Sequence, residues 1–333
     1  MSMILDGSNG VTFNDSSLQG AAASPYTLKN RIINGGFQVW QRATSTTSVN
    51  NYTCADRWYI AGSANCTISK SANPTSPNGN YFLTWTTSAS STFVNILQAI
   101  ESVNITDLRN QTVTLSAWVQ TTAGSYTGSL QFTMFSNTTD AYTVSTGQIT
   151  PISAPSVTPT GTWQQIKATF VVPSTCVSLT IYLQNTSVQA SGVTVNYADF
   201  QLEVGSTATP FERRMYGNEL ALCQRYYWQW VSTSSATYLY TGMSLSTTNI
   251  YGPVKLPVTM RASPTLTTSG TASHYGGYQG STIFTSNAVP SIDTSNPDTP
   301  LLSHTFASGL TVGNASIMGA RSTLGFFGFN AEL

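Results

Sequence analysis

Two carboxylates in the middle of the chain have a spacing that could support hydrolysis of a glycoside. Asp199 and Glu203 lie four residues apart in a stretch that alternates apolar and polar residues, which predicts one strand with both side chains on one face. A glycosidase places two carboxyls roughly 5 to 10 Å apart across a cleft. Strand and turn hydrogen bonds are the simpler role for this pair. A calcium ion held at Asp199 is a further alternative, because carboxylates and carbonyls are the usual calcium ligands.

Other kinds of catalysis have few residues to draw on. The sequence has two histidines and four cysteines, no Cys-x-x-Cys pair and no Gly-x-Ser-x-Gly motif. A zinc site is therefore not expected, and no cofactor is predicted apart from the calcium alternative. The sequence thus favours binding over catalysis. We interpret the cysteines as buried, reduced thiols; they are Cys54, Cys66, Cys176 and Cys223.

Aromatic and amide side chains offer a second kind of site, one suited to sugars. The stretch 273–281 interleaves rings with glycines between two predicted strands, which is typical of an exposed loop that faces a ligand. Its alternative is a surface turn whose tyrosines fold back over the protein. The candidate ligand-binding residues are His274, Tyr275, Tyr278 and Gln279. The tryptophans of the first half lie in predicted strands and are interpreted as core residues: Trp40, Trp58, Trp85, Trp118 and Trp163.

Composition indicates which elements must position these residues. Of the 333 residues, 8% are charged, against roughly 25% in ordinary soluble domains. Serine, threonine and asparagine take the place of the charges and suit exposed strand faces and turns, so an all-β fold is predicted. Thirteen basic and thirteen acidic side chains cancel without a basic cluster, which argues against binding to nucleic acid. No apolar run is long enough for membrane insertion, and the first residues do not resemble a secretory signal.

The length predicts two domains and a small N-terminal piece. Residues 1–29 hold too little apolar sequence to fold alone, so we expect them to dock on a partner; a frayed terminus is the alternative. Residues 30–214 contain many short predicted strands separated by turn residues, the pattern of a jelly-roll sandwich, with a first strand at 31–40. Residues 227–333 predict a smaller β-sandwich.

A short predicted helix at residues 215–226 joins the two halves. Asn218 is expected to cap it, because asparagine accepts hydrogen bonds from the first helical N–H groups. Leu220, Cys223 and Tyr227 are spaced by three and four and so form one apolar face, which must be buried. Its partner is expected to be a neighbouring domain or another copy of the chain.

Motifs along most of the chain resemble bacteriophage tail-fibre and other virion appendage proteins. The joint carries the most specific of them, and the others lie on both sides of it in a fixed order. They are NRIINGGFQVWQR at 30–42, ADRW at 55–58, QLExGxxATPFExR at 201–214, ELxxCQRYY at 219–227, LPVTMRASPT at 256–265 and NAEL at 330–333.

A second resemblance concerns residues 30–214 alone. The turn at 106–110 leads into the strand-like run 113–119, and Gly161-Thr162-Trp163 opens a later strand. This pattern is similar to jelly-roll carbohydrate-binding modules.

These resemblances imply a non-catalytic protein that adsorbs to a host surface by recognising a glycan, either a polysaccharide or a lipopolysaccharide. Tail fibres are usually homotrimers, so the face of Leu220, Cys223 and Tyr227 is implied to form a trimer joint. Residues 1–29 are implied to bind other tail proteins, and residues 227–333 to meet the receptor. The protein would belong to the virion and be assembled in the host cytoplasm. Two alternatives stay open: a structural connector of the tail or baseplate, and a polysaccharide depolymerase.

Overall fold

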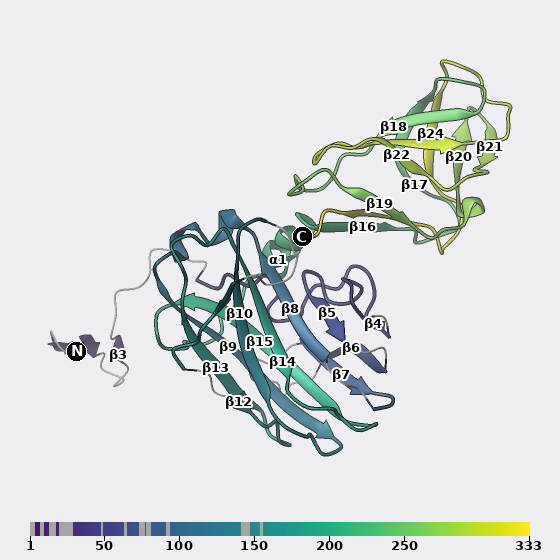
Figure 1. The fold of residues 1–333 in the computed structure, drawn as a ribbon. Helices are drawn as coiled ribbons and strands as arrows, with labels where there is room; N and C mark the ends of the chain where they lie inside the picture. Colours follow the sequence, from purple (N-terminus) through teal and green to yellow (C-terminus); the bar gives the residue numbers. More distant parts are fainter. Residues whose placement is uncertain are drawn as a thin grey trace.

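The computed structural model describes residues 4–6, 10–12, 18–19, 29–47, 49–62, 65–72, 77, 81–90, 94–140, 147–153 and 156–333. In this part of the chain the secondary structure is nearly all β-strand, which confirms the predicted fold class. The strands form two sandwiches, and helix α1 and the C-terminus both lie where the two meet (Figure 1). Among the described residues, no helix is both long and apolar enough to cross a bilayer.

The first sandwich has two antiparallel sheets. The β8 sheet has the order β11-β10-β14-β8-β5, with β12 paired to β10, and the β9 sheet has the order β13-β9-β15-β7-β6-β4. The strands of the β8 sheet are β5 (Tyr59–Gly62), β8 (Val94–Ile100), β10 (Leu130–Asn137), β11 (Gly147–Ile149), β12 (Ser156–Val157) and β14 (Ser178–Asn185). Those of the β9 sheet are β4 (Ser45–Thr46), β6 (Cys66–Ala72), β7 (Tyr81–Thr87), β9 (Thr112–Ala123), β13 (Gln164–Val171) and β15 (Thr194–Val204). Two 3-10 helices, η1 (Ser102–Asn104) and η2 (Thr106–Leu108), connect β8 to β9.

Alternate residues of both sheets meet in one apolar core. Phe200 of β15 packs 4.7 Å from the ring of Trp58 and 5.7 Å from that of Phe37. Trp58 and Trp85 are fully buried, and each buried side chain of this size contributes roughly 2 to 3 kcal/mol to folding. The prediction that these two tryptophans are core residues is confirmed.

The segment predicted as the first strand, residues 31–40, is an irregular turn instead. Asn34 has a φ of 58°, in the left-handed region that a strand does not contain. Its side chain holds this turn: Nδ2 donates to the carbonyl of Val39 at 2.8 Å, and Oδ1 accepts from the N–H of Val39 at 3.0 Å. Gly35 is needed next to it, because a Cβ there would lie 2.2 Å from the carbonyl oxygen of Phe200.

The second sandwich also has two antiparallel sheets. The β25 sheet has the order β16-β25-β19, and the β24 sheet has the order β21-β20-β24-β17-β18-β23-β22. The strands of the β25 sheet are β16 (Tyr227–Val231), β19 (Thr265–Thr268) and β25 (Phe326–Asn330). Those of the β24 sheet are β17 (Thr237–Ser244), β18 (Asn249–Pro253), β20 (Tyr275–Gln279), β21 (Thr282–Thr285), β22 (Ser291–Thr294), β23 (Leu301–Thr305) and β24 (Ala315–Ala320), with the 3-10 helix η3 (Ala272–His274) before β20.

Aromatic side chains fill the space between these two sheets. Trp228 and Phe329 are direct cross-strand partners and stack with a ring separation of 5.4 Å. Phe327 packs 5.1 Å from the ring of Tyr275, which belongs to the opposite sheet. The core therefore takes residues from both sheets, which makes this unit a sandwich as predicted.

Helix α1 (Tyr216–Gln224) begins after Met215, so the prediction that Asn218 caps it is wrong. Its apolar face is buried without another copy of the chain. Cys223 is fully buried within its own chain in a small cluster with Ile33, Val39 and Tyr226, and Leu220 and Leu222 pack against it. Of the two partners expected for this face, the neighbouring domain is therefore confirmed, because the turn at residues 30–42 of the first sandwich covers it. The inference that burial of this face requires a trimer is wrong.

The N-terminal piece is described only as three short strands: β1 (Ile4–Asp6), β2 (Gly10–Thr12) and β3 (Leu18–Gln19). They pair antiparallel in the order β1-β2-β3. The rest of residues 1–28 lies outside the described residues. Docking of residues 1–29 on other tail proteins stays a prediction.

Candidate functional site

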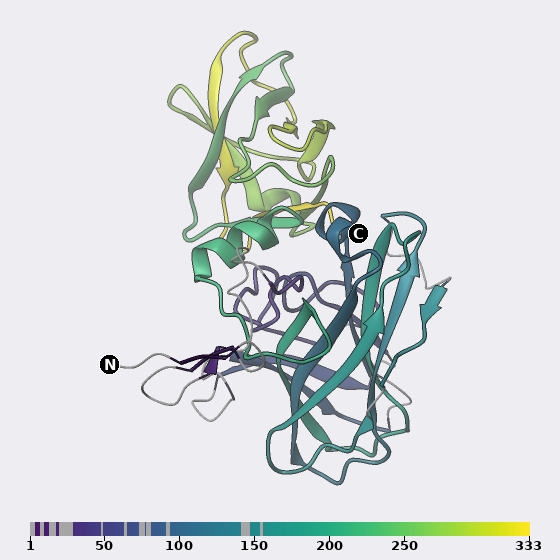
Figure 2. The same cartoon turned by 90° about the vertical axis from the view of Figure 1, so that its left-hand side faces the viewer.

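A cleft of about 500 Å³ lies between the two sandwiches, next to the joint. The β25 sheet runs along the side of the second sandwich that faces the first (Figures 1 and 2). The floor of the cleft comes from the first sandwich: Asn50, Asn51, Tyr52, Thr53 and Tyr59. The roof comes from the second sandwich, and Arg42 completes the wall; the roof residues are Tyr227, Gln229, Thr267, Phe326 and Asn330.

Local hydrogen bonds shape the floor of the cleft. Asn50 adopts a φ of 61°, and its side chain exchanges two hydrogen bonds of 3.2 Å with the backbone of Gly62. The rings of Tyr52 and Tyr59 meet edge to face at 5.2 Å. Burial raises the pKa of Tyr52, so this phenol stays a neutral donor. It donates to the carbonyl oxygen of Leu333 at 3.4 Å, which links the floor to the end of the second sandwich.

Strand alternation shapes the roof. Trp228 and Trp230 point into the second core, which leaves Tyr227 and Gln229 on the opposite face of β16. The Tyr227 hydroxyl donates to Oε1 of Gln229 at 2.7 Å. Gly328 lies beside them, and a Cβ there would come within 2.3 Å of the Thr267 hydroxyl and 2.5 Å of the Tyr227 hydroxyl. This glycine therefore allows two hydroxyls to converge on one place in the roof.

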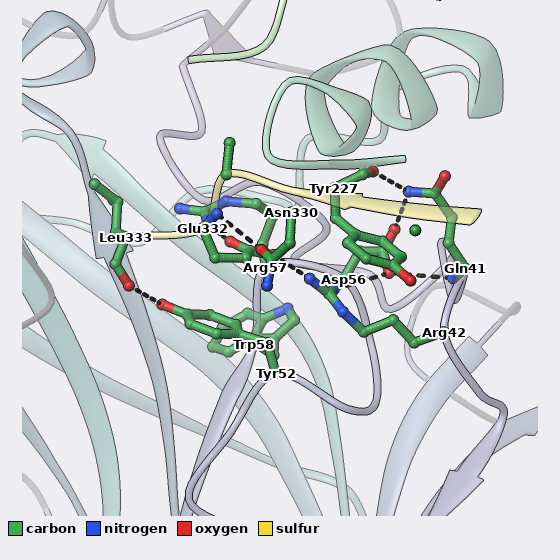
Figure 3. Close-up of polar contacts among 12 residues, drawn as sticks. Gln41, Arg42, Tyr52, Asp56, Arg57, Trp58, Tyr227, Asn330, Glu332 and Leu333 are labelled. Atoms are coloured by element: carbon green, nitrogen blue, oxygen red, sulfur yellow. Dashed lines mark hydrogen bonds and ion pairs between the residues drawn. The ribbon is translucent and has the colours of Figure 1, made fainter. Parts of the chain in front are cut away.

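A buried cluster of four charges lies behind the cleft and joins the two sandwiches (Figure 3). Arg57 pairs with Glu332, and their side chains are 1% and 4% exposed. Arg42 lies 3.3 Å from the same carboxylate and 3.7 Å from that of Asp56. Two positive and two negative groups cancel, so the cluster presents no net charge to the cleft.

Two further contacts, made by Gln41 and Arg42, extend this cluster into the roof. Nε2 of Gln41 donates both to Asp56 and, at 2.6 Å, to the carbonyl oxygen of Tyr227. The Arg42 guanidinium lies 3.5 Å from the centre of the Tyr227 ring and covers one of its faces. Burial raises the pKa of Asp56 to about 6, against the pull of Arg42 in the opposite direction.

The floor of the cleft continues onto the outer face of the β8 sheet. Tyr59, Leu97, Tyr182 and Thr133 are direct cross-strand partners on β5, β8, β14 and β10. Their chain neighbours Ile60, Ile96 and Ile181 belong to the core, so alternation points this row away from the core. Leu97 and Thr133 are themselves buried, at 0% and 5% exposure, so the accessible part of the row is its rings. Phe135 joins the row by an edge-to-face contact of 5.0 Å with Tyr182. The three aromatic residues of this row are partly exposed.

A second row, made of amides, runs beside the aromatic row. Gln131, Gln184 and Asn95 are direct partners across β10, β14 and β8, and all three are partly exposed. The Thr133 hydroxyl donates to Oε1 of Gln184 at 2.8 Å, which fixes that amide beside Tyr182. Rings that offer flat apolar faces next to amides that donate and accept hydrogen bonds suit a sugar, which has both apolar faces and hydroxyls.

The structure corrects the prediction of an exposed loop at 273–281. Residues 275–279 form strand β20, in which Tyr275 is fully buried and Gln279 is 7% exposed. The Tyr275 hydroxyl donates to the carbonyl oxygen of Phe326 at 2.8 Å, and Nε2 of Gln279 donates to the Ser244 hydroxyl at 2.6 Å. These two side chains hold the second core together and do not face a ligand.

The other two residues of that prediction are partly exposed. Tyr278 packs 5.8 Å from the ring of Tyr238, and Nδ1 of His274 lies 2.9 Å from the Ser269 hydroxyl. The structure does not bring either of them to the cleft. Ligand binding by Tyr278 and His274 stays a prediction.

The carboxylate pair at Asp199 and Glu203 is divided by a bulge. Asp199 has a φ of 56°, and the pairing of β15 with β9 shifts register between Ala198 and Gln201, so simple alternation no longer relates the two carboxylates. Glu203 accepts hydrogen bonds from the N–H of Thr209 at 2.8 Å and from its hydroxyl at 2.6 Å. Glu203 therefore has the structural role that the sequence favoured. In the described part of the chain, no group of three His, Cys, Asp or Glu residues could hold a metal ion, and calcium at Asp199 stays a prediction.

A second hollow, of about 350 Å³, lies on the outer side of the β9 sheet. Trp118, Gln165 and Phe211 are among its lining residues. Trp118 is partly exposed, so its interpretation as a core residue is wrong. This hollow provides a useful comparison for the β8 face, because it also pairs an aromatic ring with an amide.

Sequence reasoning missed the aromatic row for a clear reason. Phe135 and Tyr182 stand among polar residues at the outward positions of β10 and β14, and strand alternation alone does not say which outward residues of different strands lie side by side. Tyr59 was not recognised as a surface residue because it directly follows Trp58, which is fully buried. A usable signal was the pattern of Phe-Thr-Met-Phe at 132–135 and Ile-Tyr-Leu-Gln at 181–184, which puts a ring and a hydrogen-bonding side chain on the same outward face.

No protein-family model matches this sequence, and no curated protein matches it as a relative. Solved structures show partial likenesses. The enzymatically active domain of tailspike protein 4 from bacteriophage CBA120 is 11% identical with a TM-score of 0.38, over 54% of this chain and 22% of that chain. TmCBM61, solved in complex with β-1,4-galactotriose, is 15% identical with a TM-score of 0.35, over 53% of this chain and 99% of that one. The CBM22-1 xylan-binding domain from Paenibacillus barcinonensis is 17% identical with a TM-score of 0.32, over 52% of this chain and 94% of that one.

Proposed function

We propose that this chain is a non-catalytic glycan-binding protein of a bacteriophage tail fibre, which attaches the virion to polysaccharide or lipopolysaccharide on the host surface. The observation that carries the glycan-binding part is the aromatic row of Tyr59, Tyr182 and Phe135 beside the amide row of the β8 sheet. The tail-fibre part is supported by the ordered motifs at the joint and at both ends of the chain. Residence in the virion, assembly in the host cytoplasm and contact of residues 1–29 with other tail proteins belong to this proposal.

The chemistry of the rows favours binding over turnover. The rows hold rings, amides, a leucine and a threonine, but no carboxylate that could act as an acid or a nucleophile. The four charges behind the cleft are tied to one another in ion pairs. The ring of Tyr182 can stack on the apolar face of a sugar. The amides of Gln184 and Asn95 lie beside this ring, where they can form hydrogen bonds with the hydroxyls of the same sugar.

The test compares two aromatic substitutions in the full chain. Binding to isolated host surface polysaccharide is measured by titration for the wild type, Tyr182→Ala and Trp118→Ala. We expect Tyr182→Ala to weaken binding about tenfold, because stacking on one ring is worth about 1 kcal/mol or more. Trp118→Ala removes a comparable ring from the opposite sheet and should leave the affinity unchanged.

Other results would decide against this assignment. If Trp118→Ala loses binding and Tyr182→Ala does not, the glycan site lies on the β9 sheet and not on the β8 sheet. No binding by the wild type to any host polysaccharide would favour the structural connector. A shortening of the polysaccharide during the titration would favour the depolymerase. The homotrimer implied by the sequence resemblance stays a prediction, to be measured by light scattering of the purified chain.

A further inference from the structure

We propose that the roof of the cleft is a binding subsite for the same glycan, so that one neutral sugar chain bridges both sandwiches. This inference rests on the proposed glycan-binding function and adds three things: a role for the second sandwich, an uncharged ligand, and a ligand longer than a disaccharide. Four features of the cleft support it: its continuity with the aromatic row, its donors, its charge and its rigidity.

The cleft and the aromatic row share Tyr59. This residue is part of the floor, and it is also the end of the cross-strand row that leads through Leu97 to Tyr182. Tyr59 and Tyr182 are two strands apart, or about 10 Å, which is more than the width of one sugar ring. Leu97 between them is fully buried, so the ligand contacts the two rings and not the leucine. A chain that stacks on Tyr182 and continues in the direction of Tyr59 therefore enters the cleft.

The roof offers hydrogen-bond donors to such a chain. Oε1 of Gln229 accepts from Tyr227, and Oδ1 of Asn330 accepts from the N–H of Glu332 at 3.0 Å. As far as the chain is described, the amide nitrogens Nε2 of Gln229 and Nδ2 of Asn330 donate no hydrogen bond to the protein. Two donors on one wall of a cleft match the acceptor oxygens of a sugar. The exposed hydroxyl of Thr267 next to them donates to the carbonyl oxygen of Gly328 at 3.1 Å and can still accept from a sugar hydroxyl.

Charge and rigidity specify the ligand further. Arg42 is the charged residue that lines the cleft, and its guanidinium is already matched by Asp56 and Glu332. An acidic sugar would gain little binding free energy from that arginine, because the guanidinium already has its counter-charges. A neutral sugar does not depend on such an ion pair for its binding. The two walls are also held in place before any ligand arrives, through Arg57 with Glu332 and through Glu101, which accepts from Arg225 at 3.0 Å. A preformed cleft binds without the cost of ordering its walls.

The experiment uses the full chain on an array of neutral and acidic oligosaccharides, graded from disaccharide to hexasaccharide and including fragments of the host polysaccharide. Gln229→Ala and Thr267→Ala remove roof groups, and Thr265→Ala is the matched control: it lies on the same strand as Thr267, is exposed, and does not line the cleft. We expect the wild type to prefer long neutral oligosaccharides. The two roof variants should lower affinity for these about five- to tenfold, as the loss of a ligand hydrogen bond does, and should leave disaccharide binding unchanged.

Other outcomes would contradict the roof subsite, the neutral ligand or the glycan-binding function, and they can be told apart. If Tyr182→Ala weakens binding but neither roof variant does, or if affinity does not rise with length, the roof is not a subsite although the glycan-binding function stands. A preference for acidic oligosaccharides overturns the neutral ligand. If the wild type binds no glycan on the array, both the proposed function and the subsite fail. Unchanged melting temperatures of the roof variants separate these results from misfolding.

Discussion

Arg57 of the first sandwich and Glu332 near the end of the chain form a salt bridge in which both side chains are almost completely buried. The Arg57 guanidinium also stacks 3.5 Å from the centre of the Tyr226 ring and donates to the carbonyl oxygen of Ala99 at 2.7 Å. Residues far apart in sequence thus fix the two sandwiches to each other. Burial lowers the pKa of Arg57, but Glu332 together with Tyr226 and Tyr52 more than reverses that effect, so the pKa is raised and the arginine stays charged.

Glu332→Gln should destabilise the whole molecule. Replacing this carboxylate leaves Arg57 buried without its counter-charge, and breaking a buried pair in this way costs about 3 to 5 kcal/mol. The measurement is urea unfolding of the full chain. Asp298→Asn is the control, because its partner Lys255 is 70% exposed and the pair should contribute nothing measurable. Equal stability of the two variants would contradict the role of the Arg57 pair.

Asp56→Asn should change how stability depends on pH. Burial raises the pKa of Asp56 to about 6 in the folded protein, above its ordinary value of about 3.9. The folded state therefore binds more protons than the unfolded state between these values, and the stability that Asp56 provides is greatest below about pH 4 and is lost as the pH rises through about 6. The wild type minus Asp56→Asn difference in unfolding free energy should fall by about 3 kcal/mol over that window. A difference that stays constant from acid to neutral pH would rule this out.

His304→Phe should make the second sandwich resistant to acid. Burial lowers the pKa of His304 to about 3, and its ring packs against Tyr240, Phe306 and Phe327. The unfolded chain takes up a proton near pH 6.5 and the folded one does not, so stability falls by about 1.4 kcal/mol for each pH unit below that value. Phenylalanine keeps the ring and removes the titration. Thermal unfolding from neutral to acidic pH should be flatter for His304→Phe than for the wild type, and His274→Gln, at the partly exposed histidine, should leave the acid sensitivity in place.

The four cysteines should be unreactive in the native protein. All are free and buried, and burial raises the pKa of Cys54 to about 12 and that of Cys223 well above its ordinary value. We expect a thiol reagent at mildly alkaline pH to label none of them until the protein is unfolded, when all four should react. Labelling of native Cys223 would show that helix α1 is not sealed by its own chain. Mass spectrometry of the labelled peptides gives the stoichiometry at each cysteine.

The sequence predicted those parts of the fold that depend on local patterns. The alternation of apolar and polar residues at 193–202 predicted strand β15, and the closely spaced turn residues predicted the two sandwiches. The turn at 31–40 was missed because its conformation depends on residues far away in the chain: Gly35 lies against the carbonyl oxygen of Phe200, and the carbonyl oxygen of Asn34 accepts from Nε1 of Trp58 at 2.9 Å. The cover over helix α1 was missed for the same reason.

The candidate site was harder to predict than the fold. Tyr59, Tyr182 and Gln229 come from three separate strands, and only the pairing of those strands and the docking of the two sandwiches bring them to one surface. The opposite error occurred at 275–279, where a Tyr-Gly-Gly-Tyr-Gln run looks like a turn but is a strand. Its glycines are required by close neighbours, since a Cβ on Gly277 would lie 1.9 Å from the carbonyl oxygen of Ile317. Such long-range contacts leave no local mark in a sequence.

The salt bridge between Arg57 and Glu332 also sets an order of events during synthesis. A ribosome makes residue 57 long before residue 332, so the nascent first sandwich holds an arginine without its counter-ion until Glu332 has been made. A polypeptide that stops short of residue 332 carries this unmatched cation permanently and should be open to proteases. The NAEL motif at 330–333, which belongs to the second sandwich, therefore completes the charge balance in the interior of the first.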